Sequence, residues 1–308
     1  MLCLFFQLLY DRVSRVQNSV ADLLYLQQEE VNMAYRITIL CENSVGPISG
    51  TLGEHGFAAL IEGEGETLLF DTGQGETLLP NAQRLGKDLC RVAKVALSHG
   101  HFDHTGGLRP LLEACGPKEI YAHPALFARR YRVKDTGESI SIGIPHTEES
   151  LRGLGASFDL SDRSREIAPA IFLTGEVPRQ SSFEHGDSGL FCDDKGCAVD
   201  TIPDDQSLVI KTPKGLVLLL GCCHAGVINT VEHARRLCGV EEIYAVIGGT
   251  HLGFCAQEQL ERTVQELKKY RIRKLAPSHC TGFAAMARLS REFPKELHPA
   301  QVGYTLEI

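Results

Sequence analysis

The chain has no tryptophan, and aromatic residues make up only 7% of it. A ligand with a planar ring would therefore have to stack on phenylalanine or tyrosine. Long apolar runs are also lacking, because the apolar start of the chain breaks at Asp11 and Arg12. That stretch is too short to cross a bilayer, and it lacks the positive segment and small-residue cleavage site of a secretory leader. We expect neither a membrane span nor a leader.

An excess of positive charge is lacking as well, since the formal net charge is -8. This balance argues against a general nucleic-acid partner or an anionic membrane surface, each of which requires a basic face. Hydrophobic residues at 43% and charged residues at 23% are ordinary for a globular protein. A chain of 308 residues can bury a substantial core. The composition favours a globular protein with small-molecule partners.

Cysteine is plentiful by comparison, and its count of eleven is odd. Without a secretory leader, such a pattern favours a reducing compartment in which the thiols stay free. We therefore predict a cytoplasmic protein with free cysteines.

The first 32 residues contain neither glycine nor proline and differ in this from the rest of the chain. Met33 to Leu40 has the alternation of a first β-strand. We predict one domain over residues 33–308 and an N-terminal extension over 1–32. The extension either precedes a native start at Met33 or forms a peripheral helix.

Short apolar runs alternate with helical patterns along the rest of the chain, which predicts an α/β fold. Four of these runs are followed closely by a histidine, namely His99, His224, His251 and His279. Loops at one end of a sheet are where sites are usually built. The stretch from Arg129 to about Ser164 is irregular and polar, and we expect it to be an insertion or lid rather than core.

The densest cluster of candidate ligands lies in Ser98-His99-Gly100-His101-Phe102-Asp103-His104. It supplies three imidazoles and a carboxylate, which suit Zn, Mn or Fe. In a turn leaving a strand, His99 and His101 can share one ion, whereas Asp103 and His104 can reach a second. Two ions about 3.5–4 Å apart can clamp a substrate oxygen and activate a water. The spacing predicts a metal site.

This cluster resembles the HxHxDH motif of the metallo-β-lactamase superfamily, and Leu68–Gly73 resembles its upstream aspartate motif. The resemblance runs from about Ile37 to the C-terminus. It implies an αββα sandwich, here a single domain with the irregular insertion, with metal between the edges of two sheets. It also implies that Asp71 supports the site without binding metal.

The sequence departs from the superfamily pattern at two places. Where a bridging aspartate is expected, Gly221-Cys222-Cys223-His224 stands instead, so that Cys222 takes the bridging position and His224 is an additional ligand. Where a further histidine is expected, Glu176 is present. The departures leave open whether one or two ions are bound, with Zn as the expected metal and Mn or Fe as alternatives.

The spacing of the residues and the resemblance, with its departures, together give a set of expected site residues. The expected metal ligands are His99, His101, Asp103, His104, His224 and His279. The residues expected to support them or to act as further ligands are Asp71, Glu176 and Cys222. The expected catalytic residues are Asp103, His224 and His251.

Several further motifs resemble one branch of the superfamily, the 7,8-dihydropterin-6-methyl-4-(β-D-ribofuranosyl)aminobenzene-5′-phosphate synthase-like proteins. These motifs are Glu54–Gly56, Thr174–Arg179, Asp204–Gln206, Gly221–Gly226, Gly248–Leu252 and Pro277–Gly282. The branch implies a transferase that condenses a pterin-methyl diphosphate with an arylamine ribosyl phosphate and releases diphosphate. The implied partner is a small phosphorylated molecule such as a pterin.

Substrate-binding residues are less well marked. Arg129, Arg130 and Arg132 in the insertion could hold a phosphate, or they could form a solvated basic face. Phe183, Phe254 and Phe283 neighbour the site loops and are candidates for stacking on a pterin.

Two other functions stay open. The same metal site could lower the pKa of a water for hydrolysis of a phosphodiester or another ester or amide. Alternatively, the protein could bind metal or sense redox state without catalysis, with Cys222, Cys223 and Cys280 as sensors.

Overall fold

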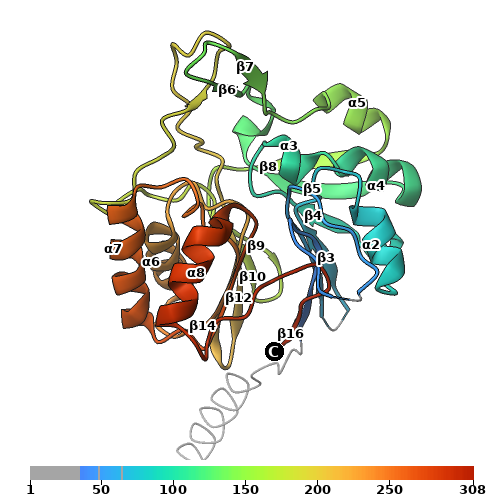
Figure 1. Cartoon of the computed structure of the whole chain (residues 1–308). Helices are drawn as coiled ribbons and strands as arrows, with labels where there is room; N and C mark the ends of the chain where they lie inside the picture. The colour runs from blue at the N-terminus through green and yellow to red at the C-terminus, as the bar shows by residue number, and fades with distance from the viewer. Residues whose placement is uncertain (1–34, 48, 64) are drawn as a thin grey trace, which may run out of the picture. The chain divides into compact units, whose positions relative to one another are not determined.

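The short apolar strands assemble into two large sheets and one small one (Figure 1). The structure is a computed structural model that describes residues 35–47, 49–63 and 65–308. The predictions for residues 1–32 and for a start at Met33 lie outside the described residues.

The first sheet has seven strands in the order β16-β1-β2-β3-β4-β5-β8. Their bounds are Arg36–Cys41 (β1), Ala58–Glu62 (β2), Thr67–Phe70 (β3), Lys94–Ala96 (β4), Lys118–Ala122 (β5), Ala156–Leu160 (β8) and Thr305–Glu307 (β16). The second sheet has six strands in the order β15-β14-β13-β12-β10-β9. Their bounds are Arg165–Ala168 (β9), Ile171–Leu173 (β10), Leu208–Thr212 (β12), Gly215–Leu220 (β13), Ile243–Gly249 (β14) and Lys274–Ser278 (β15).

Helices cover the outer face of each large sheet (Figure 1). On the first sheet these are Leu78–Arg84 (α2), Leu108–Cys115 (α4) and Glu148–Gly153 (α5). On the second they are Val227–Cys238 (α6), Gln257–Leu267 (α7) and Gly282–Glu292 (α8). The remaining helical segments are short: Phe102–Thr105 (α3), Leu89–Arg91 (η1), Pro124–Phe127 (η2), Lys268–Tyr270 (η3) and His279–Thr281 (η4). The layers are thus helix, sheet, sheet and helix, as predicted.

The sequence pattern explains why these layers form. All six residues of β13 are buried, which fits a strand covered on both faces and explains its continuous apolar sequence. Helix α6 buries Val227, Val231 and Ala234, spaced so that they share one face. That face packs on the second sheet within a core that also includes residues of α7 and α8.

The irregular insertion was predicted only in part. Tyr131–Val133 (β6) and Ser139–Ser141 (β7) form a separate small sheet with Leu190–Phe191 (β11). The later part of the stretch, however, belongs to the main fold, because α5 packs on the first sheet and β8 pairs in parallel with β5. Edge strand β8 alternates exposed residues with buried or partly buried ones and carries Ser157 and Asp159, so its composition resembles a polar loop.

The sheet topology brings the loops of interest together. Strands β3 and β4 are parallel, so Asp71 and His99 leave the same edge of the first sheet. Strands β13, β14 and β15 are also parallel, so His224, His251 and His279 leave one edge of the second sheet. The candidate ligands therefore meet where the two edges face each other.

The cysteines do not all stay free. Cys90 at η1 and Cys115 at the end of α4 form a disulfide, which contradicts the expectation of free thiols at these two positions. The other eight cysteines of the described residues are free. Within the described part of the chain, no helix is long and apolar enough to cross a membrane.

Candidate metal centre

Strand β4 and helix α3 position the first ligands. His99 and His101 lie in the connecting loop, and Asp103 and His104 lie in the single turn of α3. All four side chains are buried. Such burial of imidazoles and a carboxylate requires partners, because unpaired polar groups in the interior are costly.

Asp71 supplies several of those partners at the end of β3. Its carboxylate accepts hydrogen bonds from the backbone and hydroxyl of Ser98, both at 2.7 Å. Its Oδ2 also lies 2.7 Å from Nδ1 of His104. A Cβ at Gly221 would collide with the Ser98 side chain, so the loops from the two sheets touch here. Asp71 therefore fixes His104 by way of the ring nitrogen that faces away from the other ligands.

One group of candidate ligands is formed by His99, Cys222 and His224, whose ligand atoms lie within 4.8 Å of one another. The ring of His101 is adjacent, with centroids 4.4 Å from His99 and 5.0 Å from His224. Among the described residues, neither ring nitrogen of His224 has a hydrogen-bond partner, and Nε2 of His101 has none. These buried nitrogens point to a cation as their missing partner.

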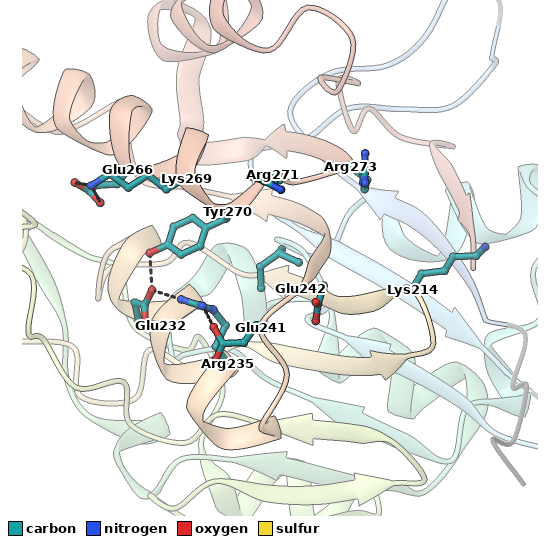
Figure 2. A pocket seen from close by; sticks show the side chains of 11 residues that line it. Lys214, Glu232, Arg235, Glu241, Glu242, Glu266, Lys269, Tyr270, Arg271 and Arg273 are labelled. Atoms are coloured by element: carbon teal, nitrogen blue, oxygen red, sulfur yellow. Dashed lines mark hydrogen bonds and ion pairs between the residues drawn. The ribbon is translucent and has the colours of Figure 1, made fainter. Parts of the chain in front are cut away.

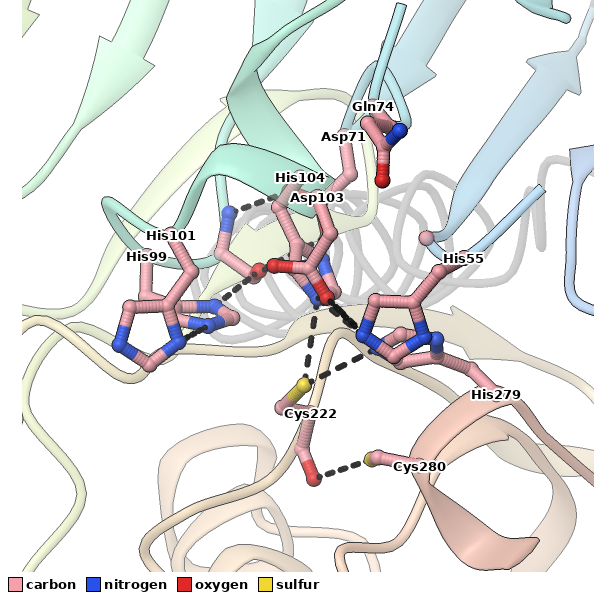
Figure 3. A network of polar contacts seen from close by, with 12 residues as sticks. His55, Asp71, Gln74, His99, His101, Asp103, His104, Cys222, His279 and Cys280 are labelled. Atoms are coloured by element: carbon pink, nitrogen blue, oxygen red, sulfur yellow. Dashed lines mark hydrogen bonds and ion pairs between the residues drawn. The ribbon is translucent and has the colours of Figure 1, made fainter. Parts of the chain in front are cut away.

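A second group is formed by Asp103, His104, Cys222 and His279 (Figure 3). Sγ of Cys222 lies 3.2 Å from Nε2 of His104 and 3.3 Å from Nε2 of His279. Oδ2 of Asp103 lies 3.3 Å from Nε2 of His279. Cys222 belongs to both groups, so its sulfur lies between two adjoining ligand sets.

Burial decides the protonation of three of the candidate ligands, His99, His101 and His224. Burial lowers the pKa of His101 to about 3. Burial likewise holds the pKa of His99 and of His224 well below the ordinary value. These imidazoles are therefore neutral, which is the form that binds metal.

Asp103 is affected differently. Burial by itself would raise the pKa of its carboxyl, but His104 and the hydrogen bonds from His279 and His55 outweigh burial and hold that pKa well below the usual range. The carboxylate is ionised, which is again the form that binds metal.

Surrounding loops hold the ligand-bearing segments in place. His279 donates its backbone N–H to Glu42 at 2.6 Å, and its Nδ1 lies 2.9 Å from Oδ1 of Asn43. Asp204 accepts the backbone N–H of Gly100 at 2.8 Å, and Gln206 donates to the carbonyl of Leu97 at 2.9 Å. The next carboxylate, that of Asp205, accepts the backbone N–H of Ala225 at 2.8 Å. The 204–206 motif thus fastens the loops of both sheets.

The backbone is strained at several residues of the candidate metal centre. Asp71, Cys223, His251 and His279 all have positive φ, between 50° and 62°. Non-glycine residues rarely adopt this conformation, and those that do are often functional. All four lie just beyond strand ends at the candidate centre.

The ligands lie at and beneath a pocket of about 240 Å³. It is lined by His55, His101, Phe102, Asp103, Arg132, Ile142, Asp187, Leu190, Cys222, His224, His251, Phe254, His279 and Cys280. Ile142 and Leu190 come from the segments around the small sheet, which therefore forms one wall.

A larger hollow of about 570 Å³ lies elsewhere, between α6, η3 and the loop before β14 (Figure 2). Its charged side chains are largely paired with one another. Glu232, for example, accepts hydrogen bonds from Arg235 at 2.7 Å and from Tyr270 at 2.8 Å. Because the three candidate ligand groups found among the described residues all contain Cys222, the chemistry belongs to the smaller pocket.

The structure does not bring Glu176 to the centre. This residue is exposed and lines a separate hollow with Arg179 and Asp205. The turn at Gly175, with φ of 62°, and the hydrogen bond from the backbone N–H of Glu176 to the carbonyl of Asp162 direct the segment away. The superfamily pattern, which suggested Glu176 as a ligand, did not predict this position of the residue.

The three arginines of the insertion have different surroundings. Arg130 is fully buried and pairs with Asp204 at 2.6 Å and with Asp200 at 3.2 Å, so it anchors the insertion and cannot reach a substrate. Arg129 is exposed and does not line the pocket. Arg132 does line it, with its guanidinium 3.0 Å from Asp187 and 47% of its side chain exposed.

The three phenylalanines also differ. Phe254 lines the pocket, 56% exposed, with its ring centroid 5.0 Å from that of His251. Phe183 is part of the core below the second sheet, and Phe283 is 90% exposed without lining the pocket. Phe102 was not predicted as a pocket residue but lines it.

Two polar residues of the pocket, His55 and Asp187, were not predicted from the sequence as site residues. Nε2 of His55 lies 3.1 Å from Oδ2 of Asp103, and its ring lies 4.9 Å from that of His279. Asp187 lies between Arg132 and His251 at the mouth. The motif Glu54-His55-Gly56 could have indicated His55 as a site residue. The sequence around Asp187 has no periodic pattern that would indicate a site residue there.

Buried, unpartnered imidazole nitrogens, an ionised carboxylate and a shared sulfur form a donor set that fits divalent ions. Together with the layered fold, this site defines a class of metal-dependent proteins built at the edges of two facing sheets. The family model of the metallo-beta-lactamase superfamily matches residues 52–189. The chain belongs to that superfamily.

The comparison with curated proteins finds 7,8-dihydropterin-6-methyl-4-(beta-D-ribofuranosyl)-aminobenzene-5′-phosphate synthase of Methanocaldococcus jannaschii. It is 32% identical over 278 residues, which cover 87% of this chain and 95% of that protein. The predicted branch of the superfamily is thereby confirmed.

Among solved structures, Tm1679, described as a metal-dependent hydrolase of the beta-lactamase superfamily, is 29% identical with a TM-score of 0.75. The match covers 89% of this chain and 99% of that one. A diphosphatase of the PhnP family is 14% identical with a TM-score of 0.51, covering 90% of this chain and 98% of that one. This second likeness shows the fold alone.

Proposed function

We propose that the protein is a metal-dependent transferase that joins a dihydropterin-methyl group to an arylamine ribosyl phosphate and releases diphosphate. The observation that carries the proposal is the similarity to the Methanocaldococcus jannaschii synthase, which extends over 95% of that protein. The side chains of the pocket are consistent with this reaction, because candidate metal ligands lie at its base and one guanidinium lies at its side.

The ligands of the proposed centre fall into two sets. His99, His101 and His224 would hold one ion, and Asp103, His104 and His279 a second, with Cys222 between them. A sulfur ligand favours Zn over Mn, because thiolates select softer ions. Bound ions would supply positive charge at the base of the pocket, where it can stabilise a diphosphate as it departs.

The other pocket residues would bind and orient the substrate. Arg132 is held near Asp187 and can bind a phosphate oxygen by charge-assisted hydrogen bonds. Phe254 and Phe102 offer aromatic surface for a pterin ring. At about 240 Å³, the pocket is slightly smaller than typical small-molecule sites. It therefore accommodates one ring system, and the second substrate would lie at the mouth.

Three residues are proposed to act on the reacting groups. Asp103 holds His55 and His279 in position through its Oδ2. The rings of His224 and His251 have centroids 4.1 Å apart and planes tilted by 51°, so the two imidazoles lie next to each other in the pocket lining. From there they can contact a bound substrate.

A metal-dependent hydrolase is the second candidate, favoured by the similarity to Tm1679 across the whole of that chain. The same ligands would serve, with a phosphodiester or another ester or amide as substrate. No second substrate would then be required.

The two candidates are separated by supplying the dihydropterin-methyl diphosphate and the arylamine ribosyl phosphate singly and together to the Zn-loaded protein. Diphosphate released only in the presence of both supports transfer. Turnover of a phosphodiester without an acceptor, in Zn or Mn, supports hydrolysis. Bound metal without either turnover would refute both candidate activities and favour a binding or redox-sensing protein.

A cytoplasmic location stays a prediction.

A further inference from the structure

A third group of candidate ligands lies beside the two that the proposed centre uses. It consists of Cys222, His251 and Cys280, whose ligand atoms lie within 4.8 Å of one another. Both cysteines are buried, with 4% of their surface exposed, and all three residues line the pocket. The motif resemblance assigns no metal to this group, and it differs from the others in containing two sulfurs.

The geometry of the group is fixed by the backbone. His251 follows β14 with φ of 56°, a conformation that is uncommon for residues other than glycine. Its backbone N–H donates to Sγ of Cys280 at 3.3 Å. Sγ of Cys280 in turn donates to the carbonyl of Cys222 at 3.3 Å (Figure 3). The two sulfurs and the imidazole are therefore held together before any ligand binds.

The imidazole of His251 is not satisfied by its neighbours. Among the described residues, neither of its ring nitrogens has a hydrogen-bond partner, although both are buried. Oδ2 of Asp187 approaches Nε2 but stays at 3.8 Å, which is too long for a hydrogen bond. A ligating histidine commonly has a carboxylate on its far side, which orients the ring. Asp187 lies beside Nε2 of His251 without such a hydrogen bond.

We propose that Cys222, His251 and Cys280 form a third cation position, which takes a thiophilic ion. Two sulfurs and an imidazole match Zn²⁺ or Cd²⁺, whereas Mn²⁺ and Mg²⁺ prefer oxygen ligands. Because Cys222 is common to all three groups, the third position adjoins the first two. It does not depend on the reaction proposed above.

Cd²⁺ is the probe, because thiolate ligands give it a characteristic ultraviolet charge-transfer absorption. The full chain is titrated with Cd²⁺, and bound Cd²⁺ is measured after gel filtration. Compared with the wild type, Cys280→Ser should bind one equivalent less and lose part of the sulfur-to-metal absorption. His251→Ala should also lose one equivalent.

Cys255→Ser provides the matched control. Cys255 is partly buried and its thiol donates to the carbonyl of Leu252 at 3.3 Å, but it lies outside the three groups. Its variant should bind Cd²⁺ as the wild type does. Unchanged stoichiometry and absorption in both Cys280→Ser and His251→Ala would overturn the third position.

A measurement on the wild type covers the case in which a variant does not fold. Iodoacetamide labelling of Cys280 is followed by mass spectrometry of the peptide, with and without Cd²⁺. Cd²⁺ should slow the labelling at least tenfold, and equal rates would contradict the proposal. Failure of both activity assays would refute the proposed function but would not alter these Cd²⁺ results.

Discussion

Oδ2 of Asp71 lies 2.7 Å from Nδ1 of His104, and neither side chain is exposed to solvent. Because Nδ1 of the ring faces this carboxylate, Nε2 faces Cys222 and His279. A carboxylate behind a ligating histidine fixes both the tautomer and the orientation of the ring. Asp71 thus controls the centre from a position outside it.

Asp71→Asn should weaken metal binding by about tenfold to a hundredfold. The variant has nearly the same shape, but one oxygen becomes an NH₂ group. This group cannot accept from both Ser98 and His104 as Oδ2 does. Competition with a chromophoric chelator measures the affinity. The exposed Asp135, substituted in the same way, is the control. Equal affinities in the two variants would show that Asp71 does not orient the ligands.

His101→Ala should remove the ion of the first ligand set and, with it, both candidate activities. The substitution removes a buried Nε2 that has no partner among the described residues, so the first ligand set loses a donor. Metal content by elemental analysis and turnover of both substrate sets are the measurements. His146→Ala, outside the pocket lining, should behave as the wild type. Full metal stoichiometry in the His101 variant would contradict its assignment as a ligand.

The cluster from His99 to His104 could be predicted from the sequence because its ligands are local. Their spacing within one turn already places them together. Likewise, His224 and His279 follow apolar strands, and parallel strands deliver their ends to one edge. The sandwich follows from the same patterns.

Other features depend on contacts between distant segments. His55 reaches Asp103 across 48 residues of chain, and only the folded loops show that Arg130 is paired internally while Arg132 is not buried. Glu176 is directed away by a local turn that the family pattern did not reveal. The disulfide between Cys90 and Cys115 likewise joins segments 25 residues apart.

Arg132→Gln should raise the KM for a phosphorylated substrate by about tenfold to a hundredfold, with a smaller effect on kcat. Glutamine keeps some hydrogen-bonding capacity but loses the charge that faces the pocket. The exposed Arg129, changed to Gln, is the control, because it does not line the pocket. Steady-state kinetics on the Zn-loaded protein provide the comparison. A KM equal to that of the Arg129 variant would remove Arg132 from substrate binding.

Glu184, which is not among the candidate metal ligands, is expected to make the stability of the protein depend on pH. Its carboxyl group lies beneath the first turn of α6 and accepts the N–H groups of Ile228 at 2.8 Å and Asn229 at 2.9 Å. Burial, which exceeds the opposing effect of these hydrogen bonds, raises the pKa of Glu184 to about 7 from 4.5. Between these two values the folded protein keeps a proton that the unfolded chain releases. Its contribution to the free energy of unfolding therefore falls as pH rises through this window, and it changes little above it.

Glu184→Gln cannot ionise, so the wild type should lose up to about 3 kcal/mol of stability relative to this variant between pH 4.5 and 7. Urea unfolding at a series of pH values measures the difference. A chelator should be present throughout, because metal affinity itself depends on pH. Glu258→Gln on α7, whose side chain is 83% exposed, should follow the wild type at every pH. If the curves of the wild type and Glu184→Gln run parallel across the window, the carboxyl group is not held protonated in the folded protein.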